Sequence, residues 1–387
     1  MEESTQIRVD LNDYSIDSDH SDLAVQFRKC LLGSLARPSA VISYAPTRTL
    51  SKACFLAVDT ALPLGLFYEH QACFDYKPWV ESELRRCGIP IVPWIYTGSL
   101  QSAEVRNFLD QGSPIVVRWP RSRGGSGIWL VRDQGELQEI PEKVPTEEFI
   151  CISPYIASAL SVNVNACVFS GGSVTLHATS VQLVGIKECT SRLLGYSGND
   201  FGLVAELPEK VLRELDSTAR VLGIWLAEHG YLGAFGFDAL IVEDSVLFVE
   251  LNPRFQASSE VGYRIDERLG RADQYMNHIA AFLGCAAEDE LSLAELVQRQ
   301  GVLSHIVIYN KKGTAVALHK ETSLERMEAR LLPNPGVVVQ PNGILAAILW
   351  SGSVTETGRE LSNEVGRAVV NLSEKFSPVY PGEGKHL

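Results

Sequence analysis

The most constraining feature of this chain is a pair of apolar runs, "YLGAFGFDALIV" and "VLFVELN", separated by Glu243-Asp244-Ser245. Two such runs around a short polar segment predict a β-hairpin. With the turn centred on Asp244, Asp238 lies opposite Glu250 on one face, whereas a turn one residue longer or shorter would place the two acids on opposite faces. Because directly opposed like charges are destabilising, the pattern predicts a cation between them.

Asn252 shares the face of Glu250, since side chains alternate along a strand. Carboxylate and carboxamide oxygens suit Mg²⁺, so Asp238, Glu250 and Asn252 are candidate metal ligands. A lone E-x-N sequence is more commonly the solvent-facing side of an ordinary strand, and the rest of the chain has to decide. Pro253-Arg254 then places a cation beside the three oxygen donors.

Asp238, Glu250, Asn252 and Arg254 resemble the metal-binding end of the ATP-grasp superfamily, which includes biotin carboxylase, carbamoyl-phosphate synthetase and D-alanine–D-alanine ligase. The resemblance implies α/β and α+β architecture, with two lobes that clasp ATP. It also implies a small α/β domain before this fold and a small α+β domain after it. The expected domains are residues 1–110, 111–290 and 291–387, and the first and last hundred residues fit the family only in outline.

The segment "SPIVVRWPRSRGGSGIWLVRD" predicts two strands around a glycine-rich turn. A Walker A loop is excluded, because no G-K-[ST] precedes a helix. Glycine leaves backbone amides uncovered for phosphates, although a plain glycine-rich hairpin is the alternative. The resemblance extends to the family's phosphate-covering loop and places Arg118 where a lysine is usual. The predicted phosphate contacts are Arg118, Gly124, Gly125, Ser126 and Gly127.

Further along, "EEFICISPYIASALSVNVNACVFSGG" predicts two strands joined at Ser153-Pro154-Tyr155. The region resembles the hinge between the two lobes, which implies that Ile152 and Ser153 contact adenine through their backbone. An acid for the ribose is missing from "SPYIASALS", so that contact is left unassigned.

The polar stretch "ATSVQLVGIKECTSRLLGYSGNDFG" predicts a long functional loop. Gln182 and Lys187 resemble the glutamine and lysine of biotin carboxylase that reach ATP and the acid substrate, which implies a catalytic Lys187. Arg192 and Asn199 are candidate contacts for a substrate carboxylate or amide. Solvated loop charges are the alternative for Lys187 and Arg192.

Other segments predict the scaffold. Strands are expected in "SAVISYA" and "IPIVPWIY" and a helix in "DYKPWVESELRRCG". A helix is expected from Pro208 to Gly230, with His229 as a helix-terminus residue. From about residue 290, strands, a hairpin at Pro341-Asn342-Gly343 and a closing helix are expected.

The charge balance of 34 basic and 47 acidic residues gives a net charge of −13, which argues against nucleic acid as the partner. Neither an apolar tract of membrane-spanning length nor a signal peptide is visible, so a cytoplasmic protein without a membrane partner is expected. The eight cysteines show no zinc spacing. A homo-oligomer is compatible with the sequence.

The resemblance implies ATP and Mg²⁺, or Mn²⁺, as cofactors, and a small-molecule carboxylic acid and an amine as substrates. The expected reaction is ADP-forming amide synthesis through an acyl phosphate, and the motifs look most like ligases of amino-acid and peptide natural-product pathways. Two alternatives stay open, namely a carboxylase-type enzyme that activates bicarbonate and a non-catalytic nucleotide-binding protein.

Overall fold

The computed structural model describes residues 22–122, 125, 127–140, 149–288, 291–320 and 327–379. The chain divides into two compact units, Met1–Phe74 and Asp75–Leu387. In the first unit, two short parallel strands and the helices around them enclose a small core that includes Leu35, Cys54 and Ala61. Its elements are α1 (Asp22–Ser34), β1 (Ser39–Val41), α2 (Arg48–Leu56), β2 (Ala61–Pro63) and α3 (Tyr68–Phe74).

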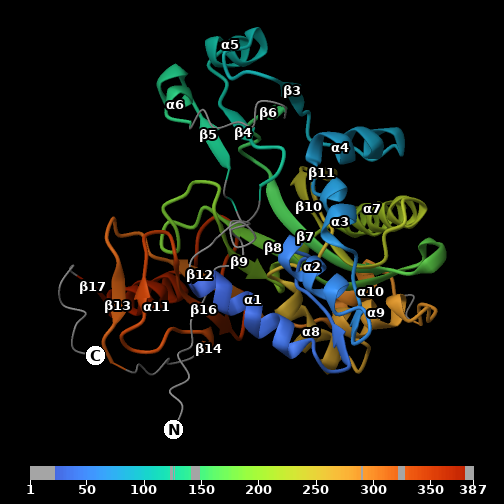
Figure 1. Cartoon of the computed structure of the whole chain (residues 1–387). Coiled ribbons are helices and arrows are strands. Elements are labelled where there is room, and N and C mark those ends of the chain that lie inside the picture. The colour runs from blue at the N-terminus through green and yellow to red at the C-terminus, as the bar shows by residue number, and fades with distance from the viewer. Residues whose placement is uncertain are drawn as a thin grey trace. The chain divides into compact units, whose positions relative to one another are not determined.

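The second unit begins with α4 (Lys77–Arg86), which has Pro78 in its first turn, where a missing amide hydrogen costs least. A four-stranded sheet of order β3-β6-β4-β5 follows (Figure 1). Helices α5 and α6 pack on this sheet through Val105, Leu109 and Leu137. The elements are β3 (Ile95–Thr97), α5 (Ala103–Asp110), β4 (Ile115–Arg118), β5 (Ile128–Val131), α6 (Gln134–Gln138) and β6 (Ile150–Pro154).

An antiparallel sheet of order β11-β10-β7-β8-β9-β12-β16-β14 forms the larger part of the second unit. Its strands are β7 (Leu160–Val168), β8 (Val174–Val184), β9 (Tyr196–Asp200), β10 (Gly233–Val242), β11 (Ser245–Asn252), β12 (Ser304–Tyr309), β14 (Met327–Leu331) and β16 (Ile344–Trp350).

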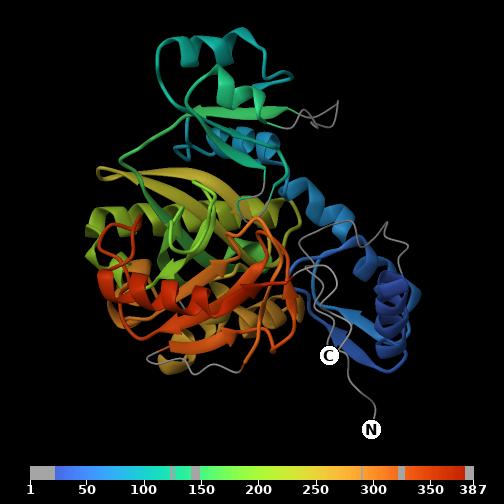
Figure 2. The same ribbon diagram turned by 90° about the vertical axis from the view of Figure 1, so that its left-hand side faces the viewer.

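Helices cover both faces of the large sheet. Val261 and Ile265 of α8 share one core with Ala178 and Phe201. A second core joins α11 to strands β12 and β16, and Figure 2 shows α11 in red beside the orange C-terminal strands. The remaining elements are η2 (Ser170–Gly172), η3 (Leu203–Glu206), α7 (Glu209–Glu228), α8 (Ser259–Arg268), α9 (Gln274–Phe282), α10 (Leu293–Arg299), α11 (Asn363–Glu374), and a small sheet of β13 (Val316–Leu318), β15 (Val338–Val339) and β17 (Phe376–Pro378).

Most predicted elements are confirmed, but the hairpin expected at Pro341-Asn342-Gly343 is not, because β15 and β16 on either side of this turn belong to different sheets. The helix expected from Pro208 is α7, and His229 is its C-terminal cap. "IPIVPWIY" is strand only at its end, because residues 89–92 instead run beside β11 with a single bridge from Ile91 to Phe248. Strands pair across the predicted domain boundaries, β3 with β6 and β9 with β12. The three-domain division stays a prediction.

The long loop expected over residues 178–202 is shorter than predicted. Strand β8 continues to Val184 and β9 begins at Tyr196, so only residues 185–195 form the loop. Gln182 and Asn199 therefore face each other in a strand pair. Within the described part of the chain, no helix is long and apolar enough to cross a membrane.

Candidate functional site

The hairpin of β10 and β11 brings the two predicted acids together. Asp238 lies opposite Glu250, as predicted, but the turn is Glu243-Asp244, one residue tighter than the predicted loop. Near the turn Val242 pairs with Ser245, and that register would place Asp238 opposite Val249. A β-bulge between Asp238 and Ala239 shifts the pairing by one residue, and this shift restores the two acids to one face.

Three amides surround the Asp238 carboxylate. Asn163 and Gln182 donate to its Oδ1 at 2.7 and 2.9 Å, and Asn252 donates to its Oδ2 at 3.3 Å. Burial, followed by repulsion from Glu250, raises the pKa of Asp238 to about 6 despite these donors. The charged form of Asp238 is thus disfavoured beside Glu250, which is the condition that a bound cation would relieve.

Lys77 forms an ion pair with Glu250. Its Nζ lies 3.3 Å from Glu250 Oε1 and donates to the carbonyl of Ser122 at 3.0 Å. The side chain is buried, with 6% exposed. Lys77 therefore joins the start of α4, the strand that carries Glu250 and the segment that leads into the glycine-rich turn. Lys77 was not predicted from the sequence, because a lysine at a helix start carries no local signal of a site 173 residues away.

Asn252 contacts Asp238, and Arg254 contacts Asn252. Arg254 Nη2 donates to Asn252 Oδ1 at 2.9 Å, and its Nη1 donates to the carbonyl of Phe255 at 3.0 Å. Asn252 is buried and Arg254 is partly exposed. The structure therefore brings together all four residues on which the sequence-based site was built.

A second layer of amides holds this arrangement. Gln256 donates to Val164 O and to Asn165 Oδ1, both at 3.1 Å, and it accepts from Asn163. Gly236 makes room for it, because a Cβ there would lie 1.6 Å from the Gln256 amide. Asn163 and Gln256 were not predicted from the sequence. Gln256 stands two residues after Arg254 in the same motif, and this proximity was the available signal.

Arg118 occupies a buried position between the two sheets. Its Nη2 pairs with Glu81 of α4, its Nη1 donates to the carbonyl of Val249 at 2.9 Å, and its guanidinium lies 3.6 Å from the centroid of the Trp94 ring. Arg118 is 2% exposed and Glu81 1%. Its guanidinium thus already has three partners, and the phosphate contact predicted for it stays a prediction.

The glycine-rich turn joins β4 to β5, as predicted. Gly124 and Ser126 lie outside the described residues. Gly125 and Gly127 have φ of 76° and 71°, which favours glycine. A Cβ at Gly125 would lie 3.2 Å from the Cα of Gly195, so Gly125 lies close to the loop between β8 and β9. Their predicted contact with phosphates stays a prediction.

Ile152 and Ser153 lie within β6, opposite Val117 and Val116 of β4, while the connection to β7 spans residues 155–159 rather than the predicted Ser153-Pro154-Tyr155. Strand β3 pairs with β6 only as far as Ile152. Ser153 therefore stands where β6 emerges beyond its neighbour β3. The adenine contact through these two residues stays a prediction.

The remaining candidates lie along β8, β9 and the loop between them. Gln182 reaches Asp238, and Asn199 opposite it is buried and bonded to Ser180 and Tyr196. Lys187 is 85% exposed, and its ammonium lies 3.8 Å from Glu188. These contacts of Asn199 and Lys187 do not include Asp238 or Glu250. The roles predicted for Asn199, Lys187 and the exposed Arg192 stay predictions.

Comparison with known proteins gives a family match. Residues 80–258 match the model of the ATP-grasp domain. The carbamoyl phosphate synthase large chain of Thermus thermophilus is 30% identical over 176 residues, which are 44% of this chain and 16% of that protein's length.

Two solved structures share the fold. The biotin carboxylase domain of Hydrogenobacter thermophilus 2-oxoglutarate carboxylase, solved with MgADP, ADP and bicarbonate, superposes with a TM-score of 0.62 at 16% identity. That superposition covers 85% of this chain and 73% of the other. Carboxyaminoimidazole ribonucleotide synthase of Aspergillus clavatus, solved with ATP, gives 0.55 at 14% identity over 84% and 79% of the two chains.

These matches agree with the predicted architecture of two clasping lobes and place the acid-bearing hairpin inside the matched region. Residues 80–258 are therefore similar to the ATP-grasp domain, and the chain shares its fold with these two solved structures.

Proposed function

We propose that the protein is an ATP-dependent ligase that activates a carboxylate as an acyl phosphate and releases ADP and phosphate. The observation that carries this proposal is the bulged register that sets Asp238 opposite Glu250, with Asn252 hydrogen-bonded to Asp238 and Arg254 hydrogen-bonded to Asn252. Support comes from the ATP-grasp domain match and from the nucleotides held by the two similar solved structures.

The residues fit Mg²⁺ carried by a nucleotide. Mg²⁺ is usually held by one or two carboxylates together with substrate phosphates rather than by a protein cage. Asp238 and Glu250 supply two carboxylates and Asn252 a carboxamide oxygen, and the described residues contain no cluster of three or more His, Cys, Asp or Glu side chains that would form a cage. A bound Mg²⁺ or Mn²⁺ would neutralise phosphate charge during transfer.

The chain's own cations complete the proposed site. Lys77 is buried between Glu250 and Ser122, and we assign it to the nucleotide phosphates that would lie beneath the glycine-rich turn. Arg254, which is held in place by Asn252 and Phe255, would stabilise the transferring phosphoryl group and the anionic intermediate. Gly125 and Gly127 would offer backbone amides to the phosphates, and Ile152 and Ser153 would contact adenine.

In the proposed reaction a carboxylate oxygen of the substrate attacks the γ-phosphorus of ATP, and the bond to ADP breaks. An amine nitrogen then attacks the carbonyl carbon, phosphate leaves with the electrons of the carbon–oxygen bond, and the nitrogen loses a proton. We propose an amino acid or peptide as the amine, in natural-product biosynthesis, with Lys187 serving this second half of the reaction.

Bicarbonate is the second candidate for the acid. It is favoured by the shared fold with the biotin carboxylase domain that was solved with MgADP and bicarbonate. The non-catalytic alternative predicts nucleotide binding without acid-dependent ADP release.

One experiment separates these functions. The protein is incubated with ATP, Mg²⁺ and either bicarbonate or pools of amino acids, and ADP and AMP are quantified separately. Hydroxylamine replaces the amine, so that an acyl phosphate is trapped as a hydroxamate while ADP is released in equal amount. Arg254→Ala should suppress this partial reaction as strongly as the full one. AMP formation would refute the mechanism, and ADP release that depends only on bicarbonate would favour the second candidate.

A further inference from the structure

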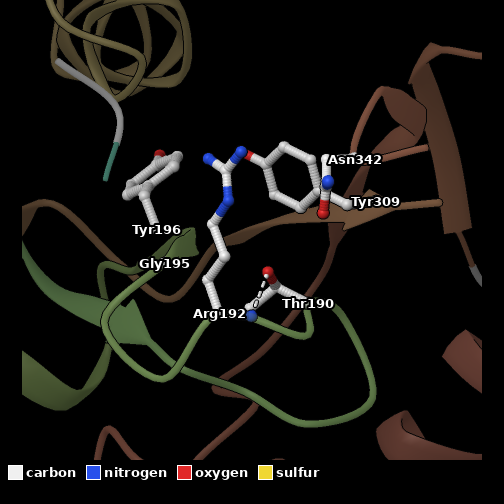
Figure 3. A pocket seen from close by; sticks show the side chains of 6 residues that line it. All are labelled: Thr190, Arg192, Gly195, Tyr196, Tyr309 and Asn342. Carbon is white, nitrogen blue, oxygen red and sulfur yellow. Dashed lines mark hydrogen bonds between the residues drawn. The ribbon is translucent and has the colours of Figure 1, made fainter. Parts of the chain in front are cut away.

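A small cavity opens where the loop of residues 185–195 meets the C-terminal strands. Figure 3 shows the Arg192 side chain rising between the rings of Tyr196 and Tyr309. The cavity measures about 10 Å³, which is the space that a single water-sized group requires. It therefore has room for one oxygen of a carboxylate, whose other atoms would lie at its mouth beside the exposed Arg192, and it excludes a purine ring. Its lining residues are Thr190, Arg192, Gly195, Tyr196, Tyr309 and Asn342.

The loop that carries Arg192 is fixed at several points. Gly185 N donates to Gly195 O at 2.8 Å and closes the loop at its base. Tyr309 N donates to Cys189 O at 2.8 Å, and Cys189 is buried in the core beneath α11. These bonds hold the backbone on which Arg192 stands at the edge of the cavity.

The Arg192 guanidinium has no carboxylate partner within the described part of the chain, although the protein carries 47 acidic residues against 34 basic ones. Its backbone amide is held by Thr190 Oγ1 at 3.2 Å. Tyr196 is in turn oriented by its hydroxyl, which donates to the buried Asn199. An arginine that is framed by aromatic rings and left without an acid offers its planar fork to an external anion.

The cavity adjoins the proposed reaction centre. Asn199, which orients Tyr196, lies directly opposite Gln182 in the sheet, and Gln182 donates to Asp238. From the other side, Gly125 of the glycine-rich turn approaches Gly195 so closely that a Cβ would lie 3.2 Å from its Cα. A ligand in the cavity would thus lie beside the turn proposed to cover the phosphates.

We infer that the cavity beside Arg192 binds a substrate carboxylate that is not itself activated, with Arg192 as its charged ligand and Tyr196 and Tyr309 as its walls. This inference rests on the proposed function, because it assigns the cavity to a substrate of that reaction. The carboxylate has two sources, namely a second carboxylate on the acid substrate or the carboxylate of an amino-acid amine. Either source makes the protein selective for substrates that carry a free carboxylate remote from the reacting group.

Acetate provides a direct test that does not need the natural substrate. The full-length protein is treated with phenylglyoxal at constant ionic strength in sodium chloride, and the modification of individual arginines is followed by peptide mass spectrometry. Replacing chloride with 100 mM acetate, a concentration on the order of that needed for a weak single-group ligand, should slow the modification of Arg192 several-fold. Acetamide should not slow it. Arg213 on α7, which is 67% exposed, is the internal control. Equal effects of acetate on the two arginines, or none on Arg192, would overturn the inference.

Kinetics then identify the source of the carboxylate. If it belongs to the amine, Arg192→Ala should lower kcat/KM about 100-fold for an amino-acid amine, spare the corresponding amino-acid amide, and leave hydroxamate formation unchanged. If it belongs to the acid, hydroxamate formation should fall as well. The matched control is Arg213→Ala, and Arg192→Lys should recover part of the loss. A tenfold weaker affinity for MgATP in Arg192→Ala would instead assign the arginine to the nucleotide and refute the inference. Failure of the acetate test with intact ADP release would refute this inference alone.

Discussion

Arg118 donates a 2.9 Å hydrogen bond from Nη1 to the carbonyl of Val249, the residue at which the β10–β11 register shifts. The bond crosses from the four-stranded sheet to the large sheet, over 131 residues of sequence. A bulge leaves one residue without a cross-strand partner, and here the carbonyl of that residue finds a charged donor. The buried Arg118–Glu81 pair thereby helps to fix the register that places Asp238 opposite Glu250.

Arg118→Lys should therefore weaken metal binding more than it weakens the fold. A lysine retains a charge for Glu81, but it lacks the fork that reaches Glu81 and Val249 together. We expect about tenfold weaker Mn²⁺ binding in the presence of ADP, equivalent to about 1.4 kcal/mol, as measured by electron paramagnetic resonance titration. Arg85→Lys is the matched control, because Arg85 also donates to a backbone carbonyl, that of Trp94, but does not contact the bulge. Equal Mn²⁺ affinities in the two variants would contradict the proposed role of the bond.

Arg118→Met should destabilise the fold by about 3–5 kcal/mol, because it leaves the Glu81 carboxylate buried without its charged partner. The double variant Arg118→Met/Glu81→Gln should regain most of this stability while Mn²⁺ binding stays weak. Urea unfolding and the same Mn²⁺ titration separate the two effects. Recovery of metal binding along with stability would show that the register does not depend on Arg118.

Glu250→Gln should abolish ADP release while leaving the fold intact. The change removes one anionic oxygen ligand at nearly constant volume, and the hairpin hydrogen bonds are made by the backbone. Circular dichroism should match the wild type, and Mn²⁺ affinity in the presence of ADP should fall. Asp244→Asn, in the exposed turn of the same hairpin, removes an equal charge and should retain activity. Near-normal turnover in Glu250→Gln would show that Glu250 is not an essential metal ligand.

The hairpin was predictable because its signals are local. Two apolar runs around a short polar segment indicate paired strands without any distant information. The bulge was not predictable, since the carbonyl of its extra residue accepts from Arg118 in another sheet. The predicted pairing of Asp238 with Glu250 is correct, but only because the one-residue shift at the bulge offsets a turn that is one residue tighter than predicted. The loop after β8 was predicted too long because the polar residues Gln182 and Asn199 pair within strands.

The residues of the candidate site also differ in whether local sequence signals predict them. Asp238, Glu250, Asn252 and Arg254 belong to one hairpin and its continuation, so they lie close enough in the sequence to be predicted as one site. Lys77 and Glu81 come from a helix far along the chain, and no pattern around them points to the hairpin. Asn163 contacts Asp238 because its strand, β7, lies next to β10 in the sheet. The order of strands in a sheet cannot be inferred from one sequence.

Single replacement of each of the eight cysteines by serine should leave measurable activity. Burial raises the pKa of Cys151 to about 11 and that of Cys189 to about 12, so both thiols stay protonated near neutral pH and are poor nucleophiles. Cys151→Ser and Cys189→Ser should lose the most stability, about 1–3 kcal/mol each, from burying a hydroxyl. ADP release and thermal unfolding are the measurements. Complete loss of activity at any position with the fold retained would reopen a covalent mechanism.

His305 should make the folded protein less stable in mild acid. Its Nε2 lies 2.8 Å from Arg330 Nη1, and its Nδ1 has no hydrogen-bond partner among the described residues. Burial lowers the pKa of His305 to about 4, against about 6.5 when it is unfolded. Above pH 6.5 the imidazole is neutral in both states. Between pH 6.5 and 4 only the unfolded chain gains the proton, so the free energy of unfolding falls as the pH is lowered.

The loss attributable to His305 should approach about 3 kcal/mol by pH 4. His305→Gln retains a side chain that can accept from Arg330 but cannot titrate, so its stability should decline less steeply over this range. Urea unfolding of both proteins at half-unit steps from pH 7 to pH 4.5 measures the difference between their free energies of unfolding. Groups that titrate in both proteins contribute equally and cancel in this difference. Parallel curves for the two proteins would show that His305 is not held neutral in the fold.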